Sequence, residues 1–130
     1  MNEGKAMAAQ IYQKVNNPEV RELLAIGFPE MRPSMTALIW GFNIAGAKTT
    51  GLWRDEQIEL LVATAVMAGG ATRQSRSHIK ASVAMGNKVE AVAKVAELAA
   101  QFTNWTGVPL PNVLDVHGLA KELAKETTSV

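Results

Sequence analysis

The chain has 130 residues, 48% of them hydrophobic and only 5% aromatic, a composition that favours one domain of closely packed helices. Its 13 basic and 12 acidic residues leave a formal charge of +1, which provides no field to attract a polyanion such as nucleic acid. The absence of cysteine excludes disulfides, thiolate metal sites and thiol redox chemistry, and it fits a cytoplasmic location.

The N-terminal segment, "MNEGKAMAAQIYQKVNN", contains no apolar stretch typical of a signal peptide. The longest apolar run, from Leu60 to Ala71, is shorter than the roughly 20 residues that cross a bilayer. A buried helix explains this run better, and we expect no membrane partner.

The dipeptide Asn17-Pro18 predicts the start of a short helix, with Asn17 as its N-cap and Pro18 at its first position. Gly27 is expected to end this helix. Its apolar side would consist of Val20, Leu23, Leu24 and Ile26.

Residues 33–47 follow the connector "FPEMRPS" and predict another helix, because their apolar positions recur about every 3.6 residues. These positions are Met35, Leu38, Ile39, Phe42 and either Ala45 or Gly46. The segment "KTTGLW" is then expected to be a turn.

Asp55 and Glu56 suit the positive end of the next helix, which continues through "QIELLVATAVMA" to Gly69-Gly70. This helix is apolar almost all round, which indicates a central place in the core.

Further helices are expected over residues 72–85 and 89–102, the first closed by Gly86-Asn87 and the second by "NWTGVPLP". Pro111 would open a last helix, whose inward residues would be Val113, Leu114, Val116, Leu119, Ala120 and Leu123. The sequence therefore predicts an all-α, single-domain bundle of about five or six helices over residues 1–130.

One charged residue, Glu59, interrupts the apolar helix, and its carboxylate would be costly to bury without a partner. On the following helix Ser75, His78 and Ser82 share one face. Consecutive helices joined by a tight glycine turn usually pack antiparallel, which would bring Glu59 near His78. Spacing alone leaves three interpretations open: a structural pair that fixes the helix register, a catalytic acid–base pair, or residues that are merely exposed at the surface.

The other charged residues of this region are expected to be solvated. Arg73, Arg76 and Lys80 point away from the polar face, and His117 lies in the charged stretch "LDVHGLAKEL". A single histidine on the polar face does not form a metal constellation, so no metal site is expected.

The stretch "LWRDEQIELLVATAVMAGGATRQSRSHIKASVAMGN", followed by an amphipathic helix and "NWTGVP", resembles the carboxymuconolactone decarboxylase and alkylhydroperoxidase D-like superfamily. The family pattern has a leucine, a glutamate entering an apolar helix, a glycine-broken turn, a histidine-bearing helix, a glycine and a glycine-x-proline. The matching positions are Leu52, Glu59, His78, Gly86, Gly107 and Pro109. The resemblance covers about Leu52 to Val116 and implies an alkylhydroperoxidase D-like helical fold.

In the peroxidase branch of this superfamily, a Cys-x-x-Cys pair precedes the histidine. The corresponding positions hold Ala71 and Gln74, so the thiol peroxidase reaction is excluded. The decarboxylase branch also lacks the cysteines and acts on a lactone acid, where proton transfer accompanies loss of carbon dioxide. This resemblance implies that His78 donates or shuttles the proton, while Glu59 orients it or tunes its pKa.

The resemblance further implies a cofactor-independent enzyme, a small carboxylated substrate and a homo-oligomer, either a trimer or a hexamer. The candidate substrate-binding residues are Gln74, Ser75, Ser82 and Trp105. For Trp105, as for Trp40 and Trp53, packing in a core or an interface is the other interpretation. The alternative function is a non-catalytic oligomeric binding or scaffold protein that retains the fold.

Overall fold

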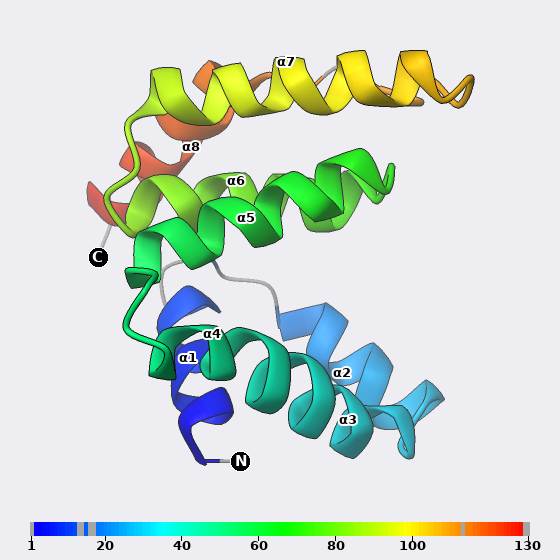
Figure 1. The fold of residues 1–130 in the computed structure, drawn as a ribbon, viewed down its shortest axis with the longest axis vertical. Coiled ribbons are helices and arrows are strands. Elements are labelled where there is room, and N and C mark those ends of the chain that lie inside the picture. Colours follow the sequence, from blue (N-terminus) through cyan, green and yellow to red (C-terminus); the bar gives the residue numbers. More distant parts are fainter. Residues whose placement is uncertain (1, 13–14, 16–17, 113, 129–130) are drawn as a thin grey trace. The chain divides into compact units, whose positions relative to one another are not determined.

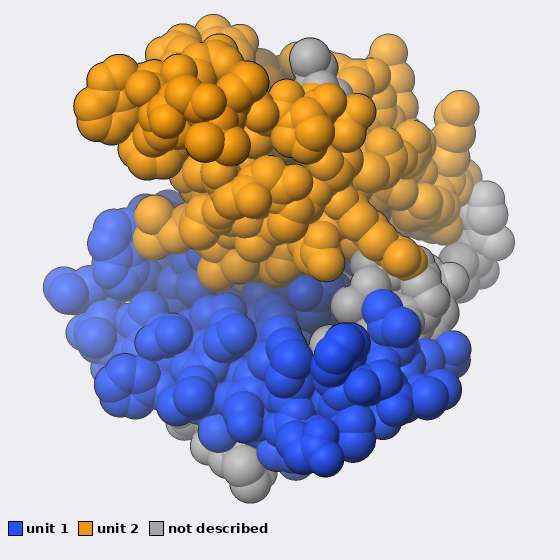
Figure 2. All heavy atoms as spheres, turned by 90° about the vertical axis from the view of Figure 1, so that its right-hand side faces the viewer, with its two compact units in different colours: residues 1–58 blue, residues 59–130 orange. Residues whose placement is uncertain are grey.

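A computed structural model describes residues 2–12, 15, 18–112 and 114–128. Every regular element in these residues is a helix (Figure 1), which confirms the all-α class, with more helical segments than expected. The chain divides into two compact units, residues 1–58 and residues 59–130, coloured separately in Figure 2. The single domain over residues 1–130 stays a prediction.

The first unit is built around the contact between its first helix and a π-helix. Its elements are α1 (Asn2–Tyr12), α2 (Pro18–Gly27), α3 (Met31–Ser34), the π-helix η1 (Met35–Ala45) and α4 (Gly46–Thr49). Gly4 of α1 lies so close to the backbone of Trp40 and Gly41 that a Cβ atom at residue 4 would come within 2.6 Å of it. The Tyr12 and Trp40 rings meet edge to face, with centroids 5.6 Å apart. Only glycine fits at position 4 without displacing η1.

The predicted helices at residues 18–26 and 33–47 exist, and Ala45 is buried as expected, but most of the other expected inward residues are not. Leu23, Ile26, Leu38, Ile39 and Phe42 are all exposed. The period of the apolar residues identifies one face of a helix, but it does not say what covers that face. The proposed cap Asn17, the inward residue Val113, and the side chains of Val20 and Leu24 lie outside the described residues.

The second unit contains the helices that carry the predicted site. They are α5 (Asp55–Ala68), which begins just before the unit, α6 (Thr72–Ala84), α7 (Val89–Trp105) and α8 (Val116–Thr128). Helix α8 packs against α6 and α7, and α6 also contacts α7. Their common core consists of Ala63, Met67, Ile79, Val92, Ala99, Val116 and Leu119.

Glycine turns end α5 and α6 in the same way. At the end of α5, the Ala71 N–H donates to the Val66 carbonyl at 3.4 Å and the Gly70 N–H donates to the Met67 carbonyl at 3.0 Å. This is the Schellman arrangement, which needs a left-handed residue, and Gly70 supplies it with a φ of 71°. Gly86, with a φ of 109°, occupies the equivalent place after α6. The predicted glycine boundaries of both helices are confirmed.

The last helix begins later than predicted, at Val116 instead of Pro111. The carboxylate of Asp115 accepts the Gly118 N–H at 2.8 Å, so Asp115 is the N-cap that sets the start of α8. Helix α7 continues to Trp105, beyond the expected end at Phe102. No helix in the described part of the chain is long and apolar enough to cross a membrane.

An ion-pair cluster joins the exposed edges of α6 and α8. Lys80 Nζ lies 2.7 Å from a carboxylate oxygen of Glu126 and 3.1 Å from one of Glu122, and Arg76 lies 3.2 Å from Glu122. Although burial alone would lower the pKa of the Lys80 ammonium, its hydrogen bonds to both glutamates raise it above the ordinary value. Lys80 was expected to be solvated, yet its side chain is only 12% exposed.

Candidate functional site

Glu59 and His78 form a buried contact between α5 and α6. The Oε1 atom of Glu59 lies 2.7 Å from Nδ1 of His78, and the two residues are 0% and 5% exposed. Glu59 lies on the second turn of α5, and His78 lies in the middle of α6. The Schellman turn at Gly70 reverses the chain between these helices and brings together two residues separated by 19 positions.

Burial dominates the electrostatics of this pair. It raises the pKa of the Glu59 carboxyl above its ordinary value, while the hydrogen bond and the charge of His78 oppose that rise. The other carboxylate oxygen, Oε2, is also buried and has no hydrogen-bond partner among the described residues. A carboxyl in this environment retains a proton more readily than an exposed glutamate, and it can exchange that proton with the imidazole.

The two serines of the predicted polar face are buried beside His78 on α6, and both take part in local hydrogen bonds. The Ser75 hydroxyl donates to the Ala71 carbonyl at 2.9 Å. The Ser82 hydroxyl accepts a hydrogen bond at 2.9 Å from the amide of Asn87. The sequence indicated Asn87 only as part of the turn that closes the helix, and not as a neighbour of the site. These hydrogen bonds fix the two ends of the helical face that carries His78.

The other two candidate binding residues have a different environment. Gln74 is exposed on α6, one position before Ser75. Trp105 is 82% exposed at the end of α7, and its ring centroid lies 5.9 Å from that of Phe102. The structure therefore places Glu59 and His78 in contact and the serines on the same buried helix face, whereas Gln74 and Trp105 lie on the surface.

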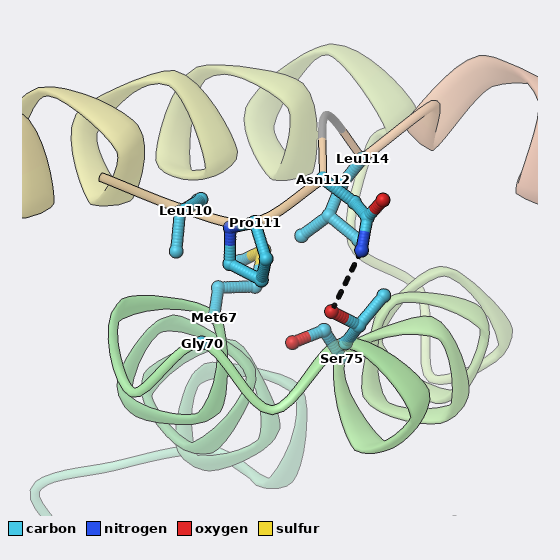
Figure 3. Close-up of a pocket in the computed structure, with 8 residues that line it drawn as sticks. Met67, Gly70, Ser75, Leu110, Pro111, Asn112 and Leu114 are labelled. Atoms are coloured by element: carbon cyan, nitrogen blue, oxygen red, sulfur yellow. Dashed lines mark hydrogen bonds between the residues drawn. The ribbon is translucent and has the colours of Figure 1, made fainter. Parts of the chain in front are cut away.

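A small hollow lies between the turn that joins α5 to α6 and the segment that precedes α8. It is open to solvent on one side, and its cavity volume of about 10 Å³ is about that needed to hold a single water molecule. Figure 3 shows Leu110 and Pro111 facing Met67 across this space, with Ser75 below Asn112. The Asn112 amide and the Thr72 hydroxyl are 3.5 Å apart at one side. The lining residues are Met67, Gly70, Thr72, Ser75, Leu110, Pro111, Asn112 and Leu114, so they include neither Glu59 nor His78.

Within the described ranges, no three His, Cys, Asp or Glu side chains lie close enough together to hold a metal ion.

No family model, curated protein or solved structure matches this chain. The functional interpretation is therefore based on the sequence pattern and on the geometry of the buried pair.

Proposed function

We propose that this chain is a cofactor-independent acid–base enzyme with an alkylhydroperoxidase D-like fold, similar to carboxymuconolactone decarboxylase. The observation that carries the proposal is the 2.7 Å contact between Glu59 and His78, two titratable side chains that are both buried. A buried carboxyl with a raised pKa next to an imidazole is the arrangement that enzymes use to move protons near neutral pH.

In this proposal His78 is the proton donor and Glu59 its positioning partner. Because Nδ1 is engaged by Glu59, the proton is passed to the substrate through the other ring nitrogen, Nε2. Loss of carbon dioxide from a carboxylated lactone leaves an electron pair on carbon, and the proton from Nε2 neutralises it. Glu59 keeps the ring in one orientation and stabilises the imidazolium before the proton is given up.

The substrate is a small carboxylated molecule, with Gln74, Ser75, Ser82 and Trp105 as candidate binding residues. The functional form is a homo-oligomer, a trimer or a hexamer, located in the cytoplasm. Thiol-dependent peroxidase chemistry has no place in this proposal, because the chain contains no cysteine.

A second candidate, a non-catalytic binding or scaffold protein, is favoured by one observation. Neither member of the pair lines the hollow, and Glu59 is fully buried. In that case the pair would fix the register of α5 against α6, as buried polar pairs do in some proteins.

The experiment is a decarboxylation assay with the purified chain. Carboxymuconolactone and related small lactone acids would be supplied, and the release of carbon dioxide measured for the native protein, Glu59→Gln and Glu90→Gln. Glu90 is exposed on α7, so its variant is the matched control. The enzyme proposal expects turnover that falls only with Glu59→Gln. No turnover of any of these acids contradicts the enzyme proposal and favours the scaffold role. Equal turnover in both variants contradicts the role of Glu59 in the reaction.

A further inference from the structure

Helix α7, the yellow helix in Figure 1, carries an apolar stripe on its exposed side. The stripe consists of Ala91, Val95, Leu98, Phe102 and Trp105, which follow one another in steps of four, three, four and three positions. Leu98 is 60% exposed, Phe102 52% and Trp105 82%. Alternating steps of three and four residues are the pattern with which one helix packs along another.

This stripe lies beside the face by which α7 joins its own core, and Val95, at its edge, is half-buried against that core. Val92, Ala99 and Thr103 are buried and form that inner face. The polar positions of the helix form a third sector, which contains Lys94 and Gln101. Leu98, Phe102 and Trp105 therefore lie outside the apolar face that packs into the core of the unit.

We propose that the α7 stripe binds the same stripe of a second copy of this chain, with the two helices antiparallel about a two-fold axis near Leu98. This inference is independent of the acid–base proposal, because neither Glu59 nor His78 takes part in the contact.

The size of the stripe residues favours a second copy in this orientation. Their side chains increase in volume along the chain, from Ala91 and Val95 through Leu98 to Phe102 and Trp105. An antiparallel pair places the small end of one stripe against the large end of the other, so the two helices stay evenly spaced. A parallel pair would place Trp105 against Trp105 and leave a gap at Ala91.

The charges beside the stripe favour the same orientation. Lys94 and Glu97, 2.7 Å apart, lie beside its first half, whereas Gln101 and Asn104 lie beside its second half. A parallel pair would place Lys94 near Lys94 of the partner copy. An antiparallel pair sets the charged half against the neutral amides, and it also opposes the two helix dipoles.

The exposed area is sufficient for a modest interface. At their exposed fractions, Phe102 and Trp105 alone offer roughly 250 Å² per copy. Leu98 and Val108, which is 71% exposed, extend this area towards the roughly 300–600 Å² of a functional surface patch. Two such patches approach the total of about 1,000 Å² that a specific interface needs. We therefore expect a two-fold contact that dissociates on dilution, either in a dimer or as the contact that joins two trimers in a hexamer.

Crosslinking can test both the contact and its direction, because the chain has no cysteine of its own. Leu98→Cys and Ala91→Cys would each be treated with a short thiol-to-thiol crosslinker, separately and as a mixture with Trp105→Cys. In the antiparallel pair Leu98→Cys crosslinks with itself. Ala91→Cys does not, because its two copies lie about 20 Å apart along the axis, but it does crosslink with Trp105→Cys. Self-crosslinking of Ala91→Cys as efficient as that of Leu98→Cys would overturn the antiparallel arrangement.

Light scattering gives the independent measurement. Phe102→Glu should convert the protein to monomers, while Gln101→Glu, on the neighbouring polar row, should leave its mass unchanged. Circular dichroism would show that both variants are folded, as expected for exposed positions. A native protein that is monomeric throughout a dilution series, or that forms only an isolated trimer, would overturn the proposal. A hexamer with two-fold contacts is compatible with it.

Discussion

The Nδ1 atom of His78 lies 2.7 Å from Oε1 of Glu59, inside a helical unit where both side chains are buried. The opposite carboxylate oxygen of Glu59, Oε2, is buried and has no hydrogen-bond partner among the described residues. Substitutions of Glu59 and of His78 should therefore differ in their consequences for folding and for proton transfer.

Removal of the imidazole should destabilise the fold. In His78→Ala the carboxyl of Glu59 loses its hydrogen bond while remaining buried, and loss of one partner of a buried pair costs about 3 kcal/mol. Chemical denaturation would measure the free energy of unfolding, with His117→Ala as the control because His117 is exposed. Equal stability of the two variants would show that the contact contributes nothing to folding.

The raised pKa of Glu59 predicts a pH dependence of stability. The folded state holds the proton more tightly than the unfolded chain, so the stability contributed by Glu59 is greatest below the ordinary pKa of 4.5. It declines as the pH rises through the folded-state pKa. The difference in unfolding free energy between native protein and Glu59→Gln should fall over this window. A difference that rises with pH would mean that His78 lowers the pKa of Glu59 by more than burial raises it.

Lys80 should contribute more to stability than an exposed lysine. Its ammonium contacts Glu122 and Glu126 of α8, whereas Lys94 pairs, among the described residues, with Glu97 of its own helix α7. We expect Lys80→Met to lower the melting temperature more than Lys94→Met does. The difference in melting temperature between the two variants should become smaller in high salt, because salt screens the ion pairs. Thermal unfolding at two salt concentrations would measure both effects, and equal melting temperatures would contradict this role of the cluster.

Gly70 should tolerate alanine poorly for a backbone reason. Its φ of 71° suits glycine, and an added Cβ would meet only Pro111 Cδ at an ordinary 3.8 Å. Gly70→Ala should therefore cost about 1 kcal/mol of strain. Gly46→Ala is the matched control, because Gly46 has a helical φ of −60° and open space around it. Denaturation should show loss of stability only for Gly70→Ala, and a neutral result would contradict the importance of the left-handed turn.

The sequence predicted the elements around the buried pair more accurately than the rest of the chain. Asp55 and the glycines that end α5 and α6 are local signals, and together with the spacing from Glu59 to His78 they gave the correct helices and the correct contact. Local signals were also misleading where two of them competed. Pro111 suits a helix start, but the cap formed by Asp115 determines the observed one.

Contacts between distant helices were beyond what the sequence could predict. Lys80 was expected in solvent because the period of α6 places it away from the polar face, and only the position of α8 brings Glu122 and Glu126 to it. Similarly, the recurrence of apolar residues over residues 33–47 predicted an apolar face that includes Phe42, but Phe42 is exposed. Periodicity describes one helix at a time, whereas burial depends on its neighbours.

The most direct test of the acid–base proposal is the rate at which the purified chain releases carbon dioxide from carboxymuconolactone, compared between His78→Gln and His117→Gln. Both rates would be measured at a temperature where circular dichroism shows each variant folded. The proposal predicts a loss of at least about 100-fold for His78→Gln, the usual contribution of a positioned acid or base, and native activity for His117→Gln. Native activity in folded His78→Gln would contradict it.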